Sequence, residues 1–220
     1  MNTARPEAMD LARRLVATLP VGLPGLFSPW QDHCPEDLPS NGPERKLERL
    51  AAHLDCAPRL VILGEAPGFL GCRHSGVAFT SEAQLCDGSI PRLPAVGRLT
   101  RRRLPFKESS ATVVWRTLYR LGLAEETITW NALQMHPHRP GEPNSNRTPK
   151  PSELAHGAAA LQILTEAFPD APLVAVGRQA EKLLGSLGFA PTAAVRHPAN
   201  GGVRDFERGM EDLARRLAAG

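Results

Sequence analysis

The chain has 220 residues, 42% of them hydrophobic and 22% charged, and a formal net charge of +3 at pH 7. This composition is typical of one globular domain with a sizeable core, and it excludes a chain that is disordered throughout. There is no apolar run of about 18 residues and no secretory signal, so we expect one domain over residues 1–220, cytoplasmic and not bound to a membrane. The small positive charge permits a nucleic-acid partner without requiring one.

Apolar spacing, capping residues and Pro/Gly breaks predict alternating helices and strands. Residues 1–43 are expected to form an N-terminal helix and a Pro- and Gly-rich segment that wraps the core through Phe27 and Trp30. In chain order we predict a helix at 8–19, a helix at 43–54, a strand at 59–63, a helix at 109–121, a strand at 127–133, a helix at 153–168, a strand at 173–176, a helix at 178–187, a strand at 192–195 and a helix at 206–217. This order implies an α/β fold, a three-layer sandwich in which helices flank a central, mostly parallel sheet of about four strands.

The four cysteines lack the spacing of a metal site. They are Cys34, Cys56, Cys72 and Cys86. No pair has the two-residue gap of zinc ribbons or redox dithiols, so we expect buried or half-buried free thiols, no metal and no cofactor. The alternative interpretation is a cluster assembled from distant cysteines.

The sequence LVILGEAPGF at residues 60–69 is the most informative stretch of the chain. Its apolar start predicts a buried strand, and the Gly/Pro turn that follows lies where open α/β sheets bind ligands. Gly64 and Gly68 allow close approach of a ligand to the backbone, and Pro67 stiffens the loop between them. Glu65 then stands beside backbone N–H groups at the mouth of a site.

Two further strand ends carry polar side chains, namely Asn131 and the segment from Arg196 to Gly202 that contains His197. Alone, an Asn at a strand end is more often a turn former, and a His before Pro is commonly a loop residue. Parallel strands, however, bring such loops to one edge of the sheet. A carboxylate, an amide and an imidazole can therefore converge on one small ligand.

The ordered motifs resemble those of the uracil-DNA glycosylase superfamily. They are Gly64-Glu65-Ala66-Pro67-Gly68, Ser75-Gly76-Val77-Ala78-Phe79-Thr80, Asn131, Asn146-Arg147-Thr148-Pro149 and His197-Pro198-Ala199-Asn200. The resemblance runs over residues 47–200 and is greatest to bacterial branches whose first motif is GEAPG. It implies an enzyme that flips uracil out of single- or double-stranded DNA and hydrolyses the N-glycosidic bond, which leaves an abasic site and initiates base excision repair.

The resemblance also implies roles for the uracil-contacting residues. The backbone of the first motif would meet the uracil oxygens, Phe79 would stack on the base and Asn131 would read its N3 and O4 edge. The first-motif positions are Gly64, Ala66, Pro67, Gly68 and Phe69. For Phe79, ordinary core packing is the competing interpretation.

Two catalytic residues follow from the same resemblance. His197 would donate to uracil O2 as negative charge grows there, and Glu65 would orient the attacking water and stabilise the cationic sugar. The best-known branch carries its carboxylate at the position of Ala66, so Glu82 is a reserve candidate. A structural role for Glu65, accepting bonds from nearby backbone donors, is the alternative.

Basic and small residues near the same edge are the expected DNA contacts. They are Arg101, Arg102, Arg103, Arg147, Arg196, Asn200, Gly201 and Gly202. The run Arg101–Arg103 is explained equally well by a solvent-exposed surface that binds no DNA. In the superfamily the loop from His197 to Gly202 inserts a residue into the duplex, but Ala199 and Asn200 are small for a wedge.

The sequence departs from relatives that hold an iron-sulfur cluster, because no cysteine lies beyond Cys86 and Cys34 has no close partner. We therefore expect no cluster, and we expect a monomer. Three alternatives stay open at this point: a glycosylase for another deaminated base such as hypoxanthine or xanthine, a relative that binds uracil or abasic DNA without turnover, and a nucleotide-binding α/β module. The lack of a Gly-rich lysine motif counts against the last.

Overall fold

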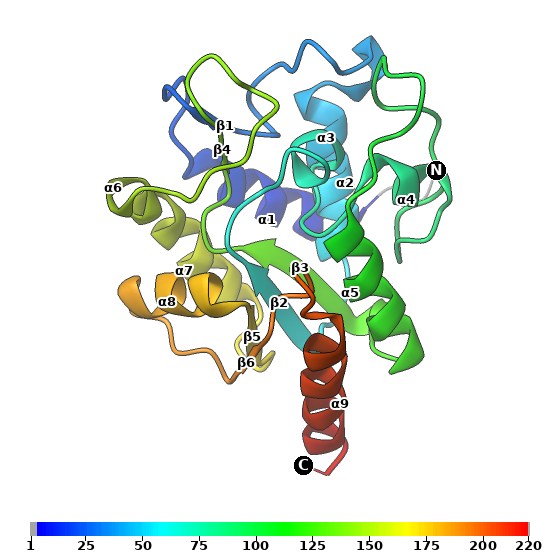
Figure 1. Ribbon diagram of the computed structural model, residues 1–220, viewed down its shortest axis with the longest axis vertical. Coiled ribbons are helices and arrows are strands. Elements are labelled where there is room, and N and C mark those ends of the chain that lie inside the picture. The colour runs from blue at the N-terminus through cyan, green and yellow to red at the C-terminus, as the bar shows by residue number, and fades with distance from the viewer. Residues whose placement is uncertain (1–3, 220) are drawn as a thin grey trace.

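The computed structural model describes residues 4–219 (Figure 1). Its central sheet has four parallel strands in the order β3-β2-β5-β6. The strands are β2 (Leu60–Gly64), β3 (Thr127–Asn131), β5 (Leu173–Val176) and β6 (Ala193–Val195). The longer helices are α1 (Pro6–Ala17), α2 (Pro43–Leu54), α5 (Ser109–Arg120), α7 (Ala158–Ala167), α8 (Arg178–Ser186) and α9 (Val203–Ala219). The predicted parallel sheet between helices is confirmed.

Several short elements were not predicted from the sequence. They are α3 (Cys72–Ser75), α4 (Glu82–Cys86), α6 (Pro151–Leu154), the 3₁₀ turns η1 (Pro39–Asn41), η2 (Ala124–Glu126) and η3 (Ala155–Gly157), and the strands β1 (Leu26–Phe27) and β4 (His136–Pro137). β1 and β4 form an antiparallel pair that joins distant parts of the sequence. None of the helices in the described part of the chain is long and apolar enough to span a membrane.

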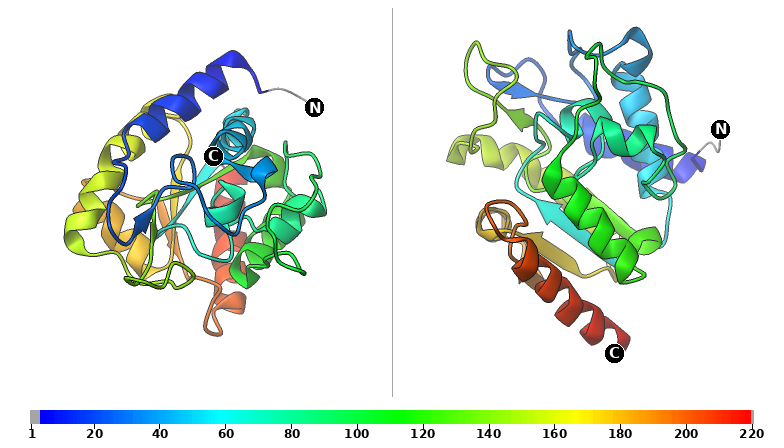
Figure 2. Two further views of the ribbon diagram at one scale, coloured as in Figure 1. Left: turned by 90° about the horizontal axis from the view of Figure 1, so that it is seen from above. Right: turned by 45° about the vertical axis from the view of Figure 1, so that its right-hand side comes forward.

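Each face of the sheet is covered by its own set of helices. Alternate residues of β2 point to opposite faces, so Val61 and Leu63 join one hydrophobic cluster while Leu60 and Ile62 join another. The first cluster includes α1, α2, α7 and α8, and the second includes α5 and α9. Figure 2 shows α5 and α9 side by side on their face. The result is the three-layer sandwich expected from the sequence.

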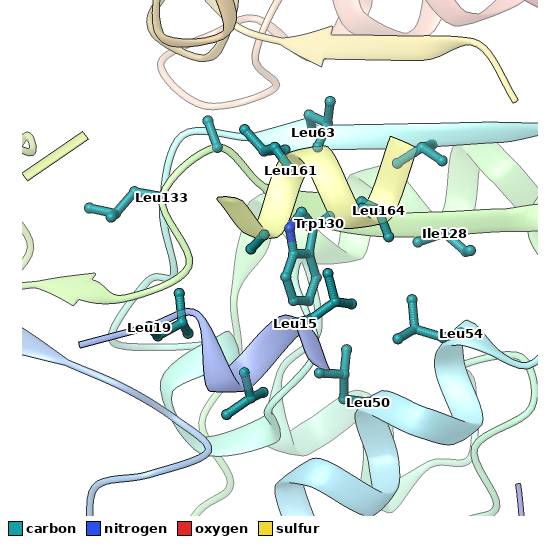
Figure 3. Close-up of a cluster of buried hydrophobic side chains, with 14 of the residues drawn as sticks. Leu15, Leu19, Leu50, Leu54, Leu63, Ile128, Trp130, Leu133, Leu161 and Leu164 are labelled. Carbon is teal, nitrogen blue, oxygen red and sulfur yellow. The ribbon is translucent and has the colours of Figure 1, made fainter. Parts of the chain in front are cut away.

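Trp130 of β3 is the centre of the first cluster. Figure 3 shows its indole among leucines of α1, α2 and α7. Trp30, from the Pro- and Gly-rich segment, stacks on it with ring centroids 5.6 Å apart and donates its indole N–H to the Gly76 carbonyl oxygen at 3.0 Å. The segment 20–43 is thus held against the core at Trp30.

The predicted helix at 153–168 is wrong in detail, because α6, η3 and α7 replace it. The interruption lies at Gly157, where the chain passes close to the end of β3. A Cβ atom on Gly157 would lie 2.0 Å from the Ala132 carbonyl oxygen. This backbone contact depends on the fold and leaves no helical signal in the local sequence.

Burial of His53 links stability to pH. Its Nε2 accepts a hydrogen bond from the Thr129 N–H at 2.9 Å, and burial, with Arg92 nearby, lowers its pKa to about 3. Between pH 6.5 and about 3 the unfolded chain therefore binds a proton that the folded chain does not, and stability falls as the pH falls.

We expect this histidine to contribute about 1.4 kcal/mol per pH unit to the slope of the unfolding free energy in that window. The His53→Gln variant keeps an acceptor for Thr129 without a titrating ring. Urea unfolding at pH 4.5–6.5 should give a shallower pH slope for the variant than for the wild type. Equal slopes would contradict the assignment.

Candidate active site

The carboxyl ends of the parallel strands open into a cleft of about 930 Å³. Most of the residues predicted for the site line it. Those that do are Gly64, Glu65, Ala66, Pro67, Gly68, Phe79, Asn131, Arg147, Arg196, His197 and Asn200. The three loops identified in the sequence therefore do converge at one edge of the sheet, as the rule for open α/β sheets requires.

Gly64 forms the floor of the cleft. It pairs with Asn131 in the β2–β3 register, and both residues are buried. A Cβ atom on Gly64 would lie 2.6 Å from Asn131 Oδ1 and 2.9 Å from Phe79 Cζ. Only a glycine at this position lets the amide and the aromatic ring meet above the strand end.

Phe79 is held in an unusual backbone conformation. Its φ of +50° lies in the left-handed region, which a bulky residue seldom adopts. The Trp115 indole N–H donates to its carbonyl oxygen at 2.9 Å, which fixes this conformation from α5. The ring centroid lies 6.4 Å from that of His197. Phe79 belongs to the second buried hydrophobic cluster and also lines the cleft, so its side chain packs in the core and borders the candidate site at the same time.

His197 is arranged as a neutral hydrogen-bond donor. Its Nδ1 accepts from the Ala199 N–H at 3.1 Å, so the ring proton is assigned to Nε2. Burial, with the charge of Arg196, lowers its pKa below the ordinary value. Gly177 (φ +92°) gives the ring room, since a Cβ there would lie 3.0 Å from the His197 Cβ.

Glu65 places a carboxyl group in the cleft without a hydrogen-bond partner among residues 4–219. Its Oε1 is buried and makes no hydrogen bond to the described residues. Burial raises the pKa of this carboxyl. The backbone of the residue is fixed, because its carbonyl oxygen accepts from the Leu133 N–H at 3.0 Å. An unpaired, desolvated carboxyl in a cleft can bind a water molecule or a developing cation.

The structure gives Phe69 a different role from the predicted contact with uracil. Its ring packs edge-on against Phe106 at 5.1 Å, and its N–H donates to Asn146 Oδ1 at 2.9 Å. The backbone donor is thus already engaged. Asn146 itself lines the cleft and was not assigned a role from the sequence.

Glu82 does not lie in the cleft, so its place as reserve catalytic carboxylate is wrong. The side chain is fully buried and accepts hydrogen bonds from the N–H groups of Leu99, Thr100 and Phe106. Although burial opposes ionisation, these bonds and the one from Arg98 lower the pKa of Glu82 to about 2. The residue anchors the loop that carries the arginine run.

Arg147 lines the cleft but has a structural partner. Its guanidinium forms two bonds of 2.7 Å to the Glu153 carboxylate and another to the Gly25 carbonyl oxygen at 3.0 Å. This bidentate pair balances the positive charge that was expected to bind phosphate. These bonds connect the loop before α6 to the N-terminal segment, and the DNA contact of Arg147 stays a prediction.

Gly201 and Gly202 shape the histidine loop from outside the cleft lining. Gly201 has a φ of +77°, and a Cβ on Gly202 would lie 2.1 Å from the His197 carbonyl oxygen. The Gly202 N–H donates to the Ala199 carbonyl oxygen at 3.1 Å. Both glycines thus make the tight turn that leads into α9, a role distinct from the predicted phosphate contact.

Glu108 was missed by sequence reasoning. It lines the cleft at the N-terminal end of α5, where it lies so close to Gly71 that a Cβ there would be 1.8 Å from Glu108 Oε2. Burial raises its pKa, and Ser110 donates a hydrogen bond to it at 2.7 Å. The local sequence offered only a glutamate before the Ser109-Ser110 pair. This pattern is equally typical of an ordinary helix start.

One group of potential metal ligands lies among the described residues, formed by Cys34, Asp37 and His74. Both oxygens of Asp37 are already bonded, one to Lys46 Nζ at 2.6 Å and the other to His74 Nδ1 at 2.7 Å. Burial lowers the pKa of Lys46, while the bonds to Asp37 and Cys34 raise that of His74 despite its burial. Asp37 is therefore fully engaged in a buried ion-pair network, whereas His74 Nε2 has no hydrogen-bond partner among the described residues. The expected absence of a metal stays a prediction.

Comparison with known proteins decides the family. Residues 52–213 match the family model described as the uracil DNA glycosylase superfamily, which is well over half of the chain. The chain belongs to the uracil-DNA glycosylase superfamily. The resemblance read from the ordered motifs is thereby confirmed, and the branch without an iron-sulfur cluster stays a prediction.

The fold comparison agrees with this membership. The structure of wild-type SMUG2 from Pedobacter heparinus is similar over the full length of both chains, with a TM-score of 0.66 and 16% sequence identity. At that identity the likeness concerns the fold. No curated protein matches the sequence. Membership of the superfamily supports a DNA glycosylase with DNA as its partner.

Proposed function

We propose that the protein removes uracil from DNA by hydrolysing its N-glycosidic bond, which leaves an abasic site for base excision repair. The observation that carries this proposal is the meeting of Asn131, Phe79 and His197 above Gly64 in one cleft. A base taken out of the DNA stack can be held there by hydrogen bonds to its N3 and O4 edge, by stacking on its face and by a hydrogen bond to its O2.

Recognition of the base is assigned to Asn131. Its amide offers both a donor and an acceptor, which match the O4 and N3–H groups of uracil. Cytosine presents an acceptor at N3 and a donor at N4, the reverse of uracil, so both groups of an amide held in the orientation that fits uracil would face mismatched partners. The Asn131 side chain is nearly fully buried, which raises the penalty for such a mismatch.

Departure of the base is assigned to the Nε2–H of His197, which donates to uracil O2 as negative charge develops on the leaving base. A neutral, desolvated donor suits this task because it needs no proton transfer. The depressed pKa of His197 keeps the ring neutral near pH 7.

Glu65 in its ionised form would stabilise the cationic sugar and orient the water that attacks it. Burial raises its pKa above 4.5, so the active carboxylate form appears only as the pH rises through that elevated value. We expect the single-turnover rate of uracil release to increase with pH over that window and then level off. In Glu65→Gln the pH-dependent step should disappear and the plateau rate should fall about 100-fold. An unchanged pH profile in the variant would remove Glu65 from the chemistry.

The size of the cleft favours one second candidate. About 930 Å³ can accommodate a purine as well as a pyrimidine, and two carboxyl groups with raised pKa, those of Glu65 and Glu108, lie on its wall. A protonated carboxyl can donate to a departing purine, so hypoxanthine or xanthine is the alternative substrate.

The proposal is tested with one oligonucleotide sequence that carries uracil, hypoxanthine or xanthine at a single position. Mild alkali after incubation converts each abasic site to a strand break that can be counted. Uracil should be released at least about tenfold faster than either purine. Faster release of a purine would establish the alternative, and tight binding to uracil or abasic DNA without any release would indicate a binding protein.

A further inference from the structure

Leu104 is an apolar side chain that the fold holds in solvent. It is 63% exposed, whereas most leucines of the sheet and its helices are buried. Only a few large hydrophobic residues of the described chain are exposed, and Leu104 lies directly after the run Arg101–Arg103. The residue belongs to the long segment between α4 and α5, drawn in green in Figure 1. Exposed apolar groups rimmed by charge are typical of interaction sites.

The loop that carries Leu104 is rigid. Glu82 accepts three main-chain hydrogen bonds of 2.9–3.0 Å from Leu99, Thr100 and Phe106, which close the loop at both ends. Arg98 bonds the same carboxylate at 2.8 Å and also the carbonyl oxygens of Arg102 and Arg103 at 2.7 and 3.0 Å. A buried carboxylate and a guanidinium thus fix the backbone on both sides of Leu104, so its exposure is not the result of a loose loop.

The loop lies beside the cleft. The Phe106 ring packs against Phe69, and the neighbours of Phe69 in the chain, Gly68 and Leu70, line the cleft. On the opposite side of the loop, the Arg101 N–H donates to the Glu36 carbonyl oxygen at 2.8 Å. These contacts place the loop next to the wall formed by the first motif.

The positive charge of the loop is complementary to the negative charge of a nucleic-acid backbone. Arg101, Arg102 and Arg103 are exposed, and within residues 4–219 none of them forms an ion pair. The Arg102 guanidinium lies 4.3 Å from the Phe106 ring centroid, which holds it in place. Three uncompensated cations beside an exposed leucine suit phosphate binding around an inserted apolar group.

We propose that Leu104 enters the base stack of duplex DNA as the wedge that fills the space left by the flipped base, with Arg101–Arg103 on the neighbouring phosphates. The loop from His197 to Gly202 offers only Ala199 and Asn200 for this task. Leu70 is less exposed and lies between Phe69 and Gly71, without a cation beside it. The inference rests on the proposed base excision, because a wedge is needed only when a base leaves a duplex.

The test compares Leu104→Ala with the wild type on the same uracil oligonucleotide, single-stranded and paired. Flipping a base out of a duplex requires unstacking, which a single strand does not, so the ratio of duplex to single-strand excision rates should fall about tenfold or more in the variant. Leu104→Met should restore most of the ratio. Val21→Ala is the matched control, since Val21 is 66% exposed and does not line the cleft.

A second readout separates this inference from the proposed function. A 2-aminopurine placed next to uracil in the duplex should brighten when wild-type protein binds and unstacks it, and clearly less with Leu104→Ala, whether or not uracil is released. Equal brightening and an unchanged rate ratio would overturn the wedge. Absence of uracil release from both substrates, with the brightening intact, would count against the proposed function alone.

Discussion

Uracil release by the His197→Ala variant is expected to be about 100- to 1000-fold slower than by the wild type. The ring is fixed by the bond from the Ala199 N–H to Nδ1, and Gly177 gives it space, so the donor is already oriented before the base departs. Such preorganised donors act chiefly on the transition state. The loss should therefore appear in the single-turnover rate, with DNA affinity changed little.

The control for this variant is His33→Ala, which removes an exposed histidine that does not line the cleft. Rapid-quench measurements with protein in excess over labelled DNA give the rate of the chemical step for both variants. The control should match the wild type. A His197→Ala rate within about threefold of the wild type would show that another group stabilises the negative charge on the departing base.

The second large effect is expected for Gly64→Ala. The added methyl group would lie 2.6 Å from Asn131 Oδ1 and 2.9 Å from Phe79 Cζ, so the amide and the ring must both move. A displacement of about 1 Å in a positioned group can reduce a rate about 100-fold, and here two groups are displaced. We expect uracil release to fall at least that far, together with binding of free uracil.

Gly185→Ala is the matched substitution. Gly185 lies in α8, and a Cβ there would meet nothing within 4 Å. This variant should retain wild-type activity and gain about 1 kcal/mol of stability from the better helix former. If Gly64→Ala keeps full activity, then Asn131 and Phe79 do not meet the base in the arrangement described.

The sequence was sufficient to predict the parallel sheet and the convergence of three loops at one edge of it. Uninterrupted apolar runs such as 60–63 mark buried parallel strands, and polar residues at their ends mark the edge where a ligand binds. These signals are local. The strand β3 ends at Asn131 although it was predicted to reach residue 133, and beyond its end Ala132 and Leu133 still donate to the carbonyl oxygens of Gly64 and Glu65.

Other features depend on contacts between distant residues and could not be predicted. The need for glycine at position 64 arises from the β2–β3 register, which places Asn131 beside it. The partners that engage Arg147 and Glu82 are contacts of the folded chain, so neither the motif position of Arg147 nor the family resemblance that made Glu82 a reserve candidate could predict them. Leu104 lies outside any helical or strand pattern, and its exposure depends on bonds that Glu82 and Arg98 make to the flanking residues in the folded chain.

A crystal structure with bound uracil tests the central claim most directly. The account predicts a single uracil above Gly64, with the Asn131 amide and His197 Nε2 both within about 3 Å of its polar atoms and Phe79 against its face. A uracil bound elsewhere in the cleft, or one that leaves either Asn131 or His197 without a hydrogen bond, would contradict it.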